Sequence, residues 1–405
     1  MKRELAHVSL RLWFASLAVF IAFSIWLWLW RFPDDPSAQY HLLAALAESM
    51  AAILGLVFTI SLVVAELTAS YSHRLLPRVL TPVTIGYIVL FIFSMMVPLV
   101  LMVQASAHAI RVSLMLGGLS LVLLIPYFRY FIYRIGPTAL LDDLANTAMD
   151  NLRSGRDAAE VETIDNVCMH ALGMKDYDIF KLALTKLGEL VLAPVNEETT
   201  LPSLASIWSS LRDISLAAIN DSRALRLSIN AIHEFGLKAT AGRLKYRVPE
   251  IISVLEKVGV TAAARAMEDG TRETVFALGG LGRSAAENHL DWPARYSISI
   301  LTQLTRSSLD NRMTAVVPFT VDAIEGIGGV AAASGLRDAA LQSASSLADI
   351  GVLSTVKGYK DVASQAAIAL KQLRSTSLGA GVVEEALRAL RSTGESPGFF
   401  EELGL

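Results

Sequence analysis

Residues 249 to 294 read PEIISVLEKVGVTAAARAMEDGT and then RETVFALGGLGRSAAENHLDWPA, which are two blocks of 23 residues that align without a gap. Seven such blocks follow one another from Arg226. One column of the alignment is always a large aliphatic residue: Ile232, Leu255, Leu278, Leu301, Ile324, Leu347 and Leu370. Apolar residues recur three positions before and after it, and a small residue recurs four positions later still, which is the spacing of one helical face. Each block therefore predicts one α-helix and a turn.

Two blocks make a helical hairpin of 46 residues, a period similar to that of the HEAT and armadillo class. We therefore expect an α-solenoid over residues 226–394, preceded by connecting helices and an irregular start over 136–225 and followed by a cap or tail over 395–405. In five of the seven blocks a glycine lies four positions after the column that begins at Ile232, which indicates close helix packing. Turn residues are predicted at Asp269-Gly270, Asn288 to Pro293, Asp310-Asn311, Ser334-Gly335, Lys357-Gly358 and Gly379 to Gly381.

The first 135 residues are different, because they are apolar and carry nine Lys or Arg against five Asp or Glu. Four stretches are long and apolar enough to cross a bilayer, which needs about 20 residues: 12–31, 42–68, 83–103 and 112–131. An N-terminus inside the cell would leave seven of the nine basic residues on the cytoplasmic side, including Arg74 and Arg78 in the loop after the second stretch. The sequence thus predicts an all-α protein of the inner membrane, with four spans, both termini cytoplasmic and a cytoplasmic solenoid.

The second span, LLAALAESMAAILGLVFTISLVVAELT from Leu42 to Thr68, contains two glutamates. At about 100° per residue, Glu48, Gly55, Thr59 and Glu66 fall within about 40° of one another on the helix. An ionisable residue in a membrane usually faces a helix bundle or a water-filled cavity. The glutamates are about 27 Å apart along the axis, close to the hydrocarbon thickness of about 30 Å, so both are expected near the membrane rims.

Two interpretations of this stripe remain open. Its small residues could simply let neighbouring helices approach, with each glutamate near an interface. Alternatively, copies of the chain could form a pore with an acidic ring at each mouth, and acidic rings select cations. The leading hypothesis is an oligomeric cation-conducting channel or transport protein in which the solenoid serves assembly or gating. The alternative is a membrane-anchored scaffold whose solenoid binds a cytoplasmic protein.

The run VFTISLVVAELTASYSHRLL, residues 57 to 76, resembles the signature V-F-S-I-x-L-V-x-x-Q-x-x-S-S-Q-x-S-P-R-L of a family of prokaryotic multipass membrane proteins of unknown function. Glu66 stands where that family usually has Gln, and His73 replaces the proline before the arginine. A second signature of the family is only weakly echoed by Asp213, Ile214, Asn220 and Asp221. The resemblance implies a membrane fold and no particular activity.

Other chemistry finds little support in the sequence. A net charge of −3 without a basic run gives no footprint for nucleic acid. The seven histidines lack metal-ligand spacing, and Cys168 is the only cysteine. The glycine clusters at Gly279 to Gly282 and Gly326 to Gly329 lack the Lys-Ser/Thr of a phosphate loop and fall in the repeat column. No nucleophile elbow is present. We therefore expect no enzyme activity, no cofactor and no resident metal.

Overall fold

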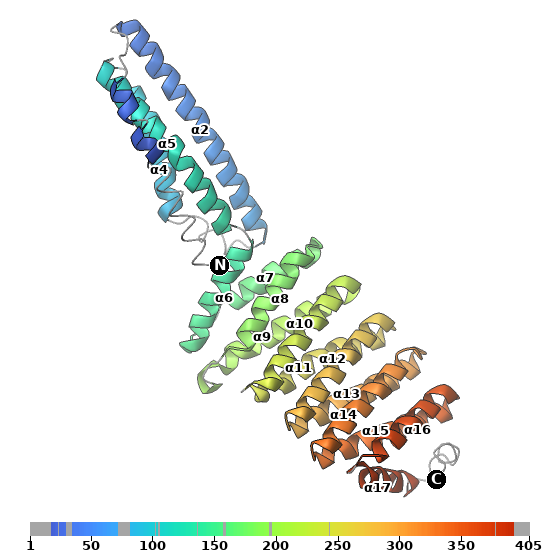
Figure 1. Cartoon of the computed structure of the whole chain (residues 1–405). Helices are drawn as coiled ribbons and strands as arrows, with labels where there is room; N and C mark the ends of the chain where they lie inside the picture. The colour runs from blue at the N-terminus through green and yellow to red at the C-terminus, as the bar shows by residue number, and fades with distance from the viewer. Residues whose placement is uncertain are drawn as a thin grey trace. The chain divides into compact units, whose positions relative to one another are not determined.

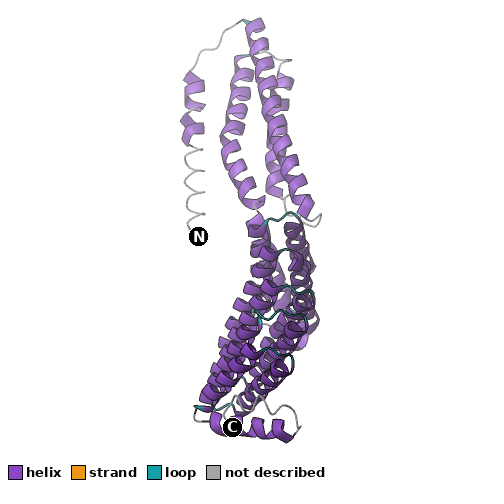
Figure 2. Cartoon of the chain, turned by 90° about the vertical axis from the view of Figure 1, so that its right-hand side faces the viewer, coloured by secondary structure: helices purple, strands orange, loops and turns teal. Residues whose placement is uncertain are grey.

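The computed structural model describes residues 18–22, 24–29, 35–71, 82–101, 103, 106–135, 137–156, 159–193, 197–242, 244–376 and 378–392. All regular elements in these ranges are helices (Figure 2). The chain divides into two compact units, an N-terminal unit of residues Met1–Leu140 and a repeat unit of residues Leu141–Leu405. The boundary lies inside a helix, slightly after the predicted end of the membrane domain at residue 135.

Three long helices form the described body of the N-terminal unit: α2 (Pro36–Tyr71), α4 (Pro82–Leu101) and α5 (Ala107–Ile135) (Figure 1). Helix α2 begins at Pro36, six residues before the predicted second span. Proline suits the first helical position, and the carboxylate of Asp35 accepts the backbone N–H of Ser37 at 3.1 Å.

Of the four predicted spans, two are matched by described helices that are long and apolar enough to cross a membrane, namely Ser37–Val63 and Thr84–Leu101. The fourth falls in α5, where the apolar part among the described residues is the shorter segment His108–Leu124. The first falls on the apolar helix Ala18–Leu29 and extends outside the described residues. Within the described residues, length and composition thus support two of the four predicted spans.

The three helices pack through small apolar clusters and hydroxyl pairs. Val57 of α2, Phe91 of α4 and Tyr127 of α5 form one buried cluster, and Leu43 meets Ala109 and Ile110 in another. The hydroxyl oxygens of Ser61 and Tyr127 lie 2.7 Å apart, joining α2 to α5, and those of Ser94 and Ser120 lie 2.5 Å apart, joining α4 to α5. Hydrogen bonds of this kind are typical of helix bundles in membranes, where apolar contacts alone contribute little to the association of helices.

The repeat unit is a stack of helix pairs in two layers. Layer A contains α6 (Pro137–Arg153), α8 (Tyr177–Val191), α10 (Ser222–Ala241), α12 (Glu268–Glu287), α14 (Val317–Ala333) and α16 (Lys360–Arg374). Layer B contains α7 (Ala159–Gly173), α9 (Glu197–Ala217), α11 (Val248–Ala264), α13 (Asp291–Asp310), α15 (Arg337–Val356) and α17 (Gly379–Ser392). Short 3-10 turns, Ala218–Asn220 and Lys245–Arg247, precede α10 and α11. From α8 onward each helix packs against the next helix of its own layer, and Lys186 of α8 pairs with Asp142 of α6 at 2.8 Å.

The packing follows the predicted 23-residue pattern. All seven residues of the column that begins at Ile232 are at most 1% exposed. Polar contacts recur one hairpin apart, as where Arg226 of α10 meets Glu273 of α12 at 2.6 Å, 47 residues along the chain. The prediction of an all-helical repeat domain with one helix per block is therefore confirmed. Stacking also explains the recurring glycines, because a Cβ at Gly236 would collide with Leu281 and one at Gly282 with Ile327 of the next layer-A helix.

The turns between blocks also recur every 23 residues. A residue with positive φ ends five successive helices, at Ala266, His289, Arg312, Gly335 and Gly358. The residue after each donates its N–H to a carbonyl five residues back, as Leu336 does to Ala331 at 2.8 Å, which is the Schellman arrangement. The turns predicted at Asp269-Gly270 and at Gly379 to Gly381 were misplaced, since these residues lie inside α12 and α17.

Candidate functional site: the polar face of α2

The four residues of the predicted stripe, Glu48, Gly55, Thr59 and Glu66, all lie on the exposed face of α2. The opposite face carries Leu43, Met50 and Val57, which are buried against α4 and α5. At 100° per residue the stripe is centred about 160° from that buried face. The described part of the chain therefore leaves the stripe uncovered.

Local geometry at the middle of the stripe shows how open it is. The Thr59 hydroxyl donates a hydrogen bond to the carbonyl of Gly55 at 2.8 Å, so its oxygen lone pairs remain directed outward. A Cβ placed on Gly55 would have no described atom within 4 Å. Packing within the described chain therefore does not account for the small residue at this position.

The contacts of α2 also show how far each of its two glutamates lies from the ends of the three-helix bundle. Val57 lies level with Phe91 of the antiparallel α4, and both Glu66 and Pro82 are nine residues, or about 13.5 Å, from that level. Glu66 is thus level with the first residue of α4. At the other end, Leu43 clusters with Ala109, Ile110 and Leu101, the last residue of α4, and Glu48 lies five residues, or about 7.5 Å, further in. Glu48 is therefore the deeper of the two carboxylates.

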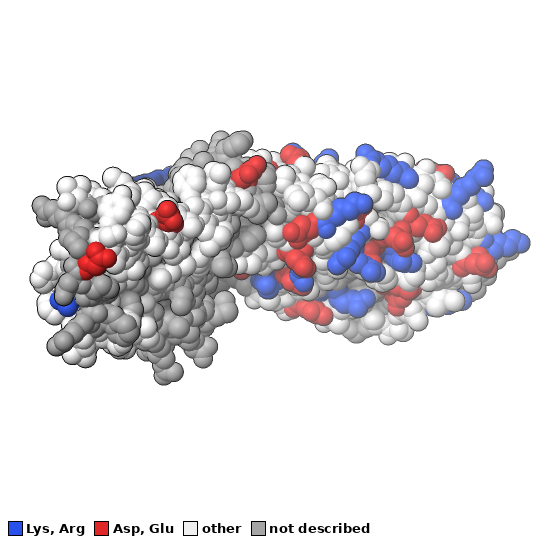
Figure 3. Space-filling view, turned by 90° about the horizontal axis from the view of Figure 1, so that it is seen from above, with Lys and Arg blue, Asp and Glu red and all other residues white. Residues whose placement is uncertain are grey.

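The surface around this face is mainly apolar. Of the large hydrophobic residues that are exposed in the described chain, 22 lie at or before Leu121 and seven at or after Met169. On the face drawn in Figure 3, the repeat unit carries interspersed acidic and basic side chains, whereas the described surface of the N-terminal unit is mostly uncharged. A soluble monomer rarely exposes a contiguous apolar patch above about 300–600 Å².

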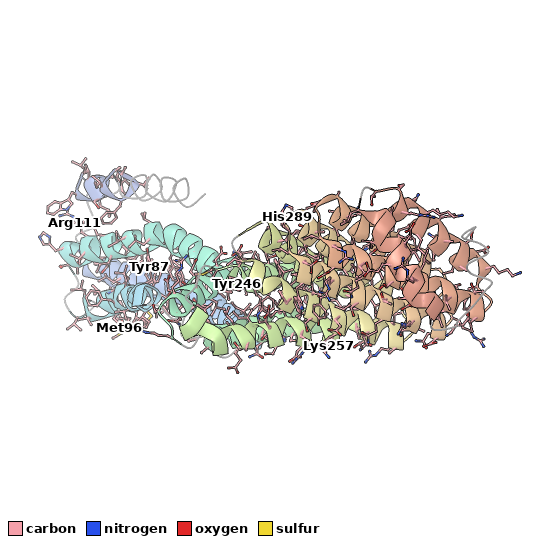
Figure 4. All side chains as sticks on the ribbon, turned by 90° about the horizontal axis from the view of Figure 1, so that it is seen from below. Tyr87, Met96, Arg111, Tyr246, Lys257 and His289 are labelled. Carbon is pink, nitrogen blue, oxygen red and sulfur yellow. The ribbon has the colours of Figure 1, made fainter. Side chains whose placement is uncertain are left out.

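An aromatic and a basic group meet at one end of the bundle. Figure 4 shows Arg111 beside the first apolar helix and Tyr87 within the bundle. The Arg111 guanidinium is 5.5 Å from the ring centroid of Trp28, so the start of α5 meets the end of the first apolar helix. Tryptophan rings such as that of Trp28 are enriched at membrane interfaces. The predicted basic loop with Arg74 and Arg78 lies outside the described residues.

The remaining sequence candidates do not assemble into a reactive site. Cys168 is buried in α7, and burial together with Asp165 raises the pKa of its thiol well above the ordinary value. Both glycine clusters lie inside helices, in α12 and α14, as the packing interpretation expected. Among the described residues, no group of three His, Cys, Asp or Glu is placed to hold a metal ion.

Two features were missed by sequence reasoning. The hydroxyl pairs of the bundle have no signature, because single serines and tyrosines in apolar helices are common. A cavity of about 510 Å³ between the starts of α10 and α12 is the second, and it is lined by Arg223, Arg226, Glu268 and Arg272 among others. Arg226 and Arg272 are already paired there, with Glu273 at 2.6 Å and Asp269 at 2.7 Å.

Comparisons with known proteins leave the family open. No family model matches the chain, and no curated protein matches it. The resemblance of residues 57 to 76 to a membrane-protein family therefore stays a prediction. A solved structure described as a "circular tandem repeat protein with novel repeat topology and enhanced subunit contact surfaces" aligns over 88% of this chain and 98% of its own, with 14% identity and a TM-score of 0.40.

Proposed function

We propose that the chain is a subunit of an inner-membrane assembly whose copies turn the polar face of α2 toward a shared, water-containing pathway for cations. The observation that carries this proposal is the position of Glu48 on an uncovered face, inside the apolar part of α2. A charged side chain facing lipid at the centre of a span costs about 2.5–3.5 kcal/mol or more. Water between copies lowers that cost.

Each residue of the stripe has a role in this proposal. Rings of Glu48 and Glu66 raise the local concentration of cations. Gly55 keeps the middle of the pathway wide, and the outward lone pairs of Thr59 can replace water around a passing ion. The described helices of one chain leave this face open, so the proposal requires self-assembly. With both termini cytoplasmic, the repeat unit lies in the cytoplasm and serves assembly or gating.

Cation flux into liposomes that contain the purified full-length protein tests the proposal. We expect flux with the parent protein and a severalfold loss when Glu48→Gln is combined with Glu66→Gln. Glu268→Gln is the matched control, because it removes one carboxylate from an exposed position in α12. Absence of flux in the parent, or unchanged flux in the double variant, contradicts a cation pathway.

A second candidate function, a membrane-anchored scaffold, is favoured by the repeat unit. Phe276 of α12 is 52% exposed, and its ring lies 5.3 Å from that of Phe319 on the neighbouring α14. Exposed aromatic residues are enriched where proteins bind one another. A photo-crosslinking residue at position 276 should capture one defined cytoplasmic protein, and the same residue at Glu268 should not. Equal capture at both positions contradicts a scaffold surface there.

A further inference from the structure

We infer that the hydroxyl pair of Ser61 and Tyr127 sets the rotation of α2 about its own axis, and so decides which face of α2 is turned toward the pathway. This inference rests on the proposed function, because only that function makes the direction of this face important. Neither residue belongs to the stripe. They act as positioning residues, through the orientation of the helix that carries Glu48 and Thr59.

The geometry of the pair is directional. The Ser61 hydroxyl donates to the carbonyl of Val57 at 2.7 Å, which uses its only proton. When the Ser61 proton is directed to the Val57 carbonyl, the Tyr127 hydroxyl, 2.7 Å from the same oxygen, is the donor between the two helices. Ser61 then acts as the acceptor on α2.

Tyr127 is a rigid reference point for α2. Its side chain is 0% exposed, and its ring centroid lies 5.1 Å from that of Tyr87 and 6.0 Å from that of Phe91, both on α4. Because the tyrosine belongs to α5 and packs on α4, its hydroxyl is positioned by the two helices that α2 packs against. A hydrogen bond between this hydroxyl and Ser61 therefore restrains the rotation of α2 about its own axis.

Apolar packing alone restrains that angle less well. Dispersion contacts of the Leu43, Met50 and Val57 face are non-directional, and large apolar residues also occupy other faces of α2, including the exposed Leu56 and Phe58. A turn of α2 by one residue position, about 100°, brings Phe58 to the angle that Thr59 held. That turn removes the Ser61 hydroxyl from Tyr127.

The bundle offers a matched control. Ser94 and Ser120 join α4 to α5 by a buried hydroxyl contact of 2.5 Å, and neither residue belongs to α2. Ser94→Ala therefore removes an interhelical hydrogen bond of the same kind without releasing α2. Ser61→Thr keeps a hydroxyl opposite Tyr127 and serves as the conservative variant.

The rotation is measured by cross-linking within one full-length chain in membranes. Met50→Cys and Gly117→Cys place thiols at a close α2–α5 contact, where the Met50 Cε lies 3.0 Å from the position of a Gly117 Cβ. The native Cys168 is buried. With a short bifunctional thiol reagent we expect high yield in this background, a severalfold loss on adding Ser61→Ala or Tyr127→Phe, and no loss with Ser94→Ala or Ser61→Thr. Unchanged yield with both Ser61→Ala and Tyr127→Phe, or an equal loss with Ser94→Ala, overturns the inference.

A separate labelling experiment tests the proposed water-containing pathway independently of the cross-linking result. A water-soluble thiol reagent should modify Thr59→Cys severalfold faster than Phe58→Cys, and Ser61→Ala should bring the two rates together. Equal rates in the parent background contradict the water-containing pathway. The cross-linking yield still decides whether the hydroxyl pair orients α2.

Discussion

Arg374 of α16 stands in the position that Gly328 holds in α14, one 46-residue hairpin earlier. Its guanidinium lies 3.3 Å from the carboxylate of Glu384 in α17. Earlier members of this column, Gly236 and Gly282, make room for a large residue of the next layer-A helix. A long charged side chain at position 374 leaves no such room. The change from glycine to arginine therefore coincides with the last described helix of layer A.

Two adjacent glycines of α14 test this packing argument. A Cβ at Gly328 would lie 2.6 Å from the Cβ of Ser343, whereas nothing described lies within 4 Å of a Cβ at Gly329. We expect Gly328→Ala to destabilise the repeat unit by about 1–3 kcal/mol through overpacking. Gly329→Ala should stabilise it by up to about 1 kcal/mol through helix propensity. Thermal unfolding of the full-length variants by circular dichroism measures both, and equal shifts contradict the close approach.

The left-handed turn residues give a second prediction. Ala266 has a φ of 54°, and a non-glycine residue in this region costs about 1–2 kcal/mol. Ala266→Gly should therefore raise the melting temperature, with a gain of about 1 kcal/mol after the added freedom of the unfolded chain is subtracted. Gly335→Ala, at the equivalent position with a φ of 75°, should lower it by a similar amount. Shifts of the same sign in both variants would show that these turns are not strained.

His233 makes the stability of the repeat unit depend on pH. Its ring lies over Gly280 of α12, and its Nε2 atom is buried without a hydrogen-bond partner among the described residues. Burial lowers the pKa of His233, and Glu234 acts in the opposite direction. The unfolded chain therefore binds a proton more readily, so stability is retained above about pH 6.5 and is lost as the pH falls toward the folded-state pKa. His233→Gln should flatten the melting temperature between pH 7 and 5, and an unchanged slope contradicts this assignment.

The depths of the two glutamates predict unequal effects on conduction. Glu48 lies about 7.5 Å inward from the level of the last residue of α4, whereas Glu66 is level with the first residue of α4. A carboxylate in a narrow, poorly solvated region interacts more strongly with a passing cation, because the effective dielectric constant is lower. Glu48→Gln alone should reduce the preference for cations over anions severalfold more than Glu66→Gln. Reversal potentials across planar bilayers measure the preference for cations over anions. Equal losses in the two variants would contradict the argument that Glu48 lies in the more poorly solvated region.

The sequence predicted the repeat because each helix must bury one apolar face, and the required spacing is visible in residues such as Leu278 and Leu301. It was less informative about turns. Ala266 adopts a left-handed conformation without being glycine or asparagine, and the turn is completed by the backbone bond from Met267 to Ala262 at 2.9 Å. A glycine nearby, Gly270, was taken for the breaker, although it lies buried within α12 beside Leu225.

The sequence by itself determined that Glu48, Gly55, Thr59 and Glu66 share one face, because 3.6 residues per turn fixes their angles once the segment is helical. Only the tertiary structure decided where that face points. Large apolar residues occur all around α2, so no periodicity identifies its packed side. The contacts of Val57 with α4 and α5, and of Ser61 with Tyr127, select one rotation. In that rotation the described helices leave the acidic face uncovered. Contacts between specific side chains can fix a rotation because they have a direction, whereas the hydrophobic effect has none.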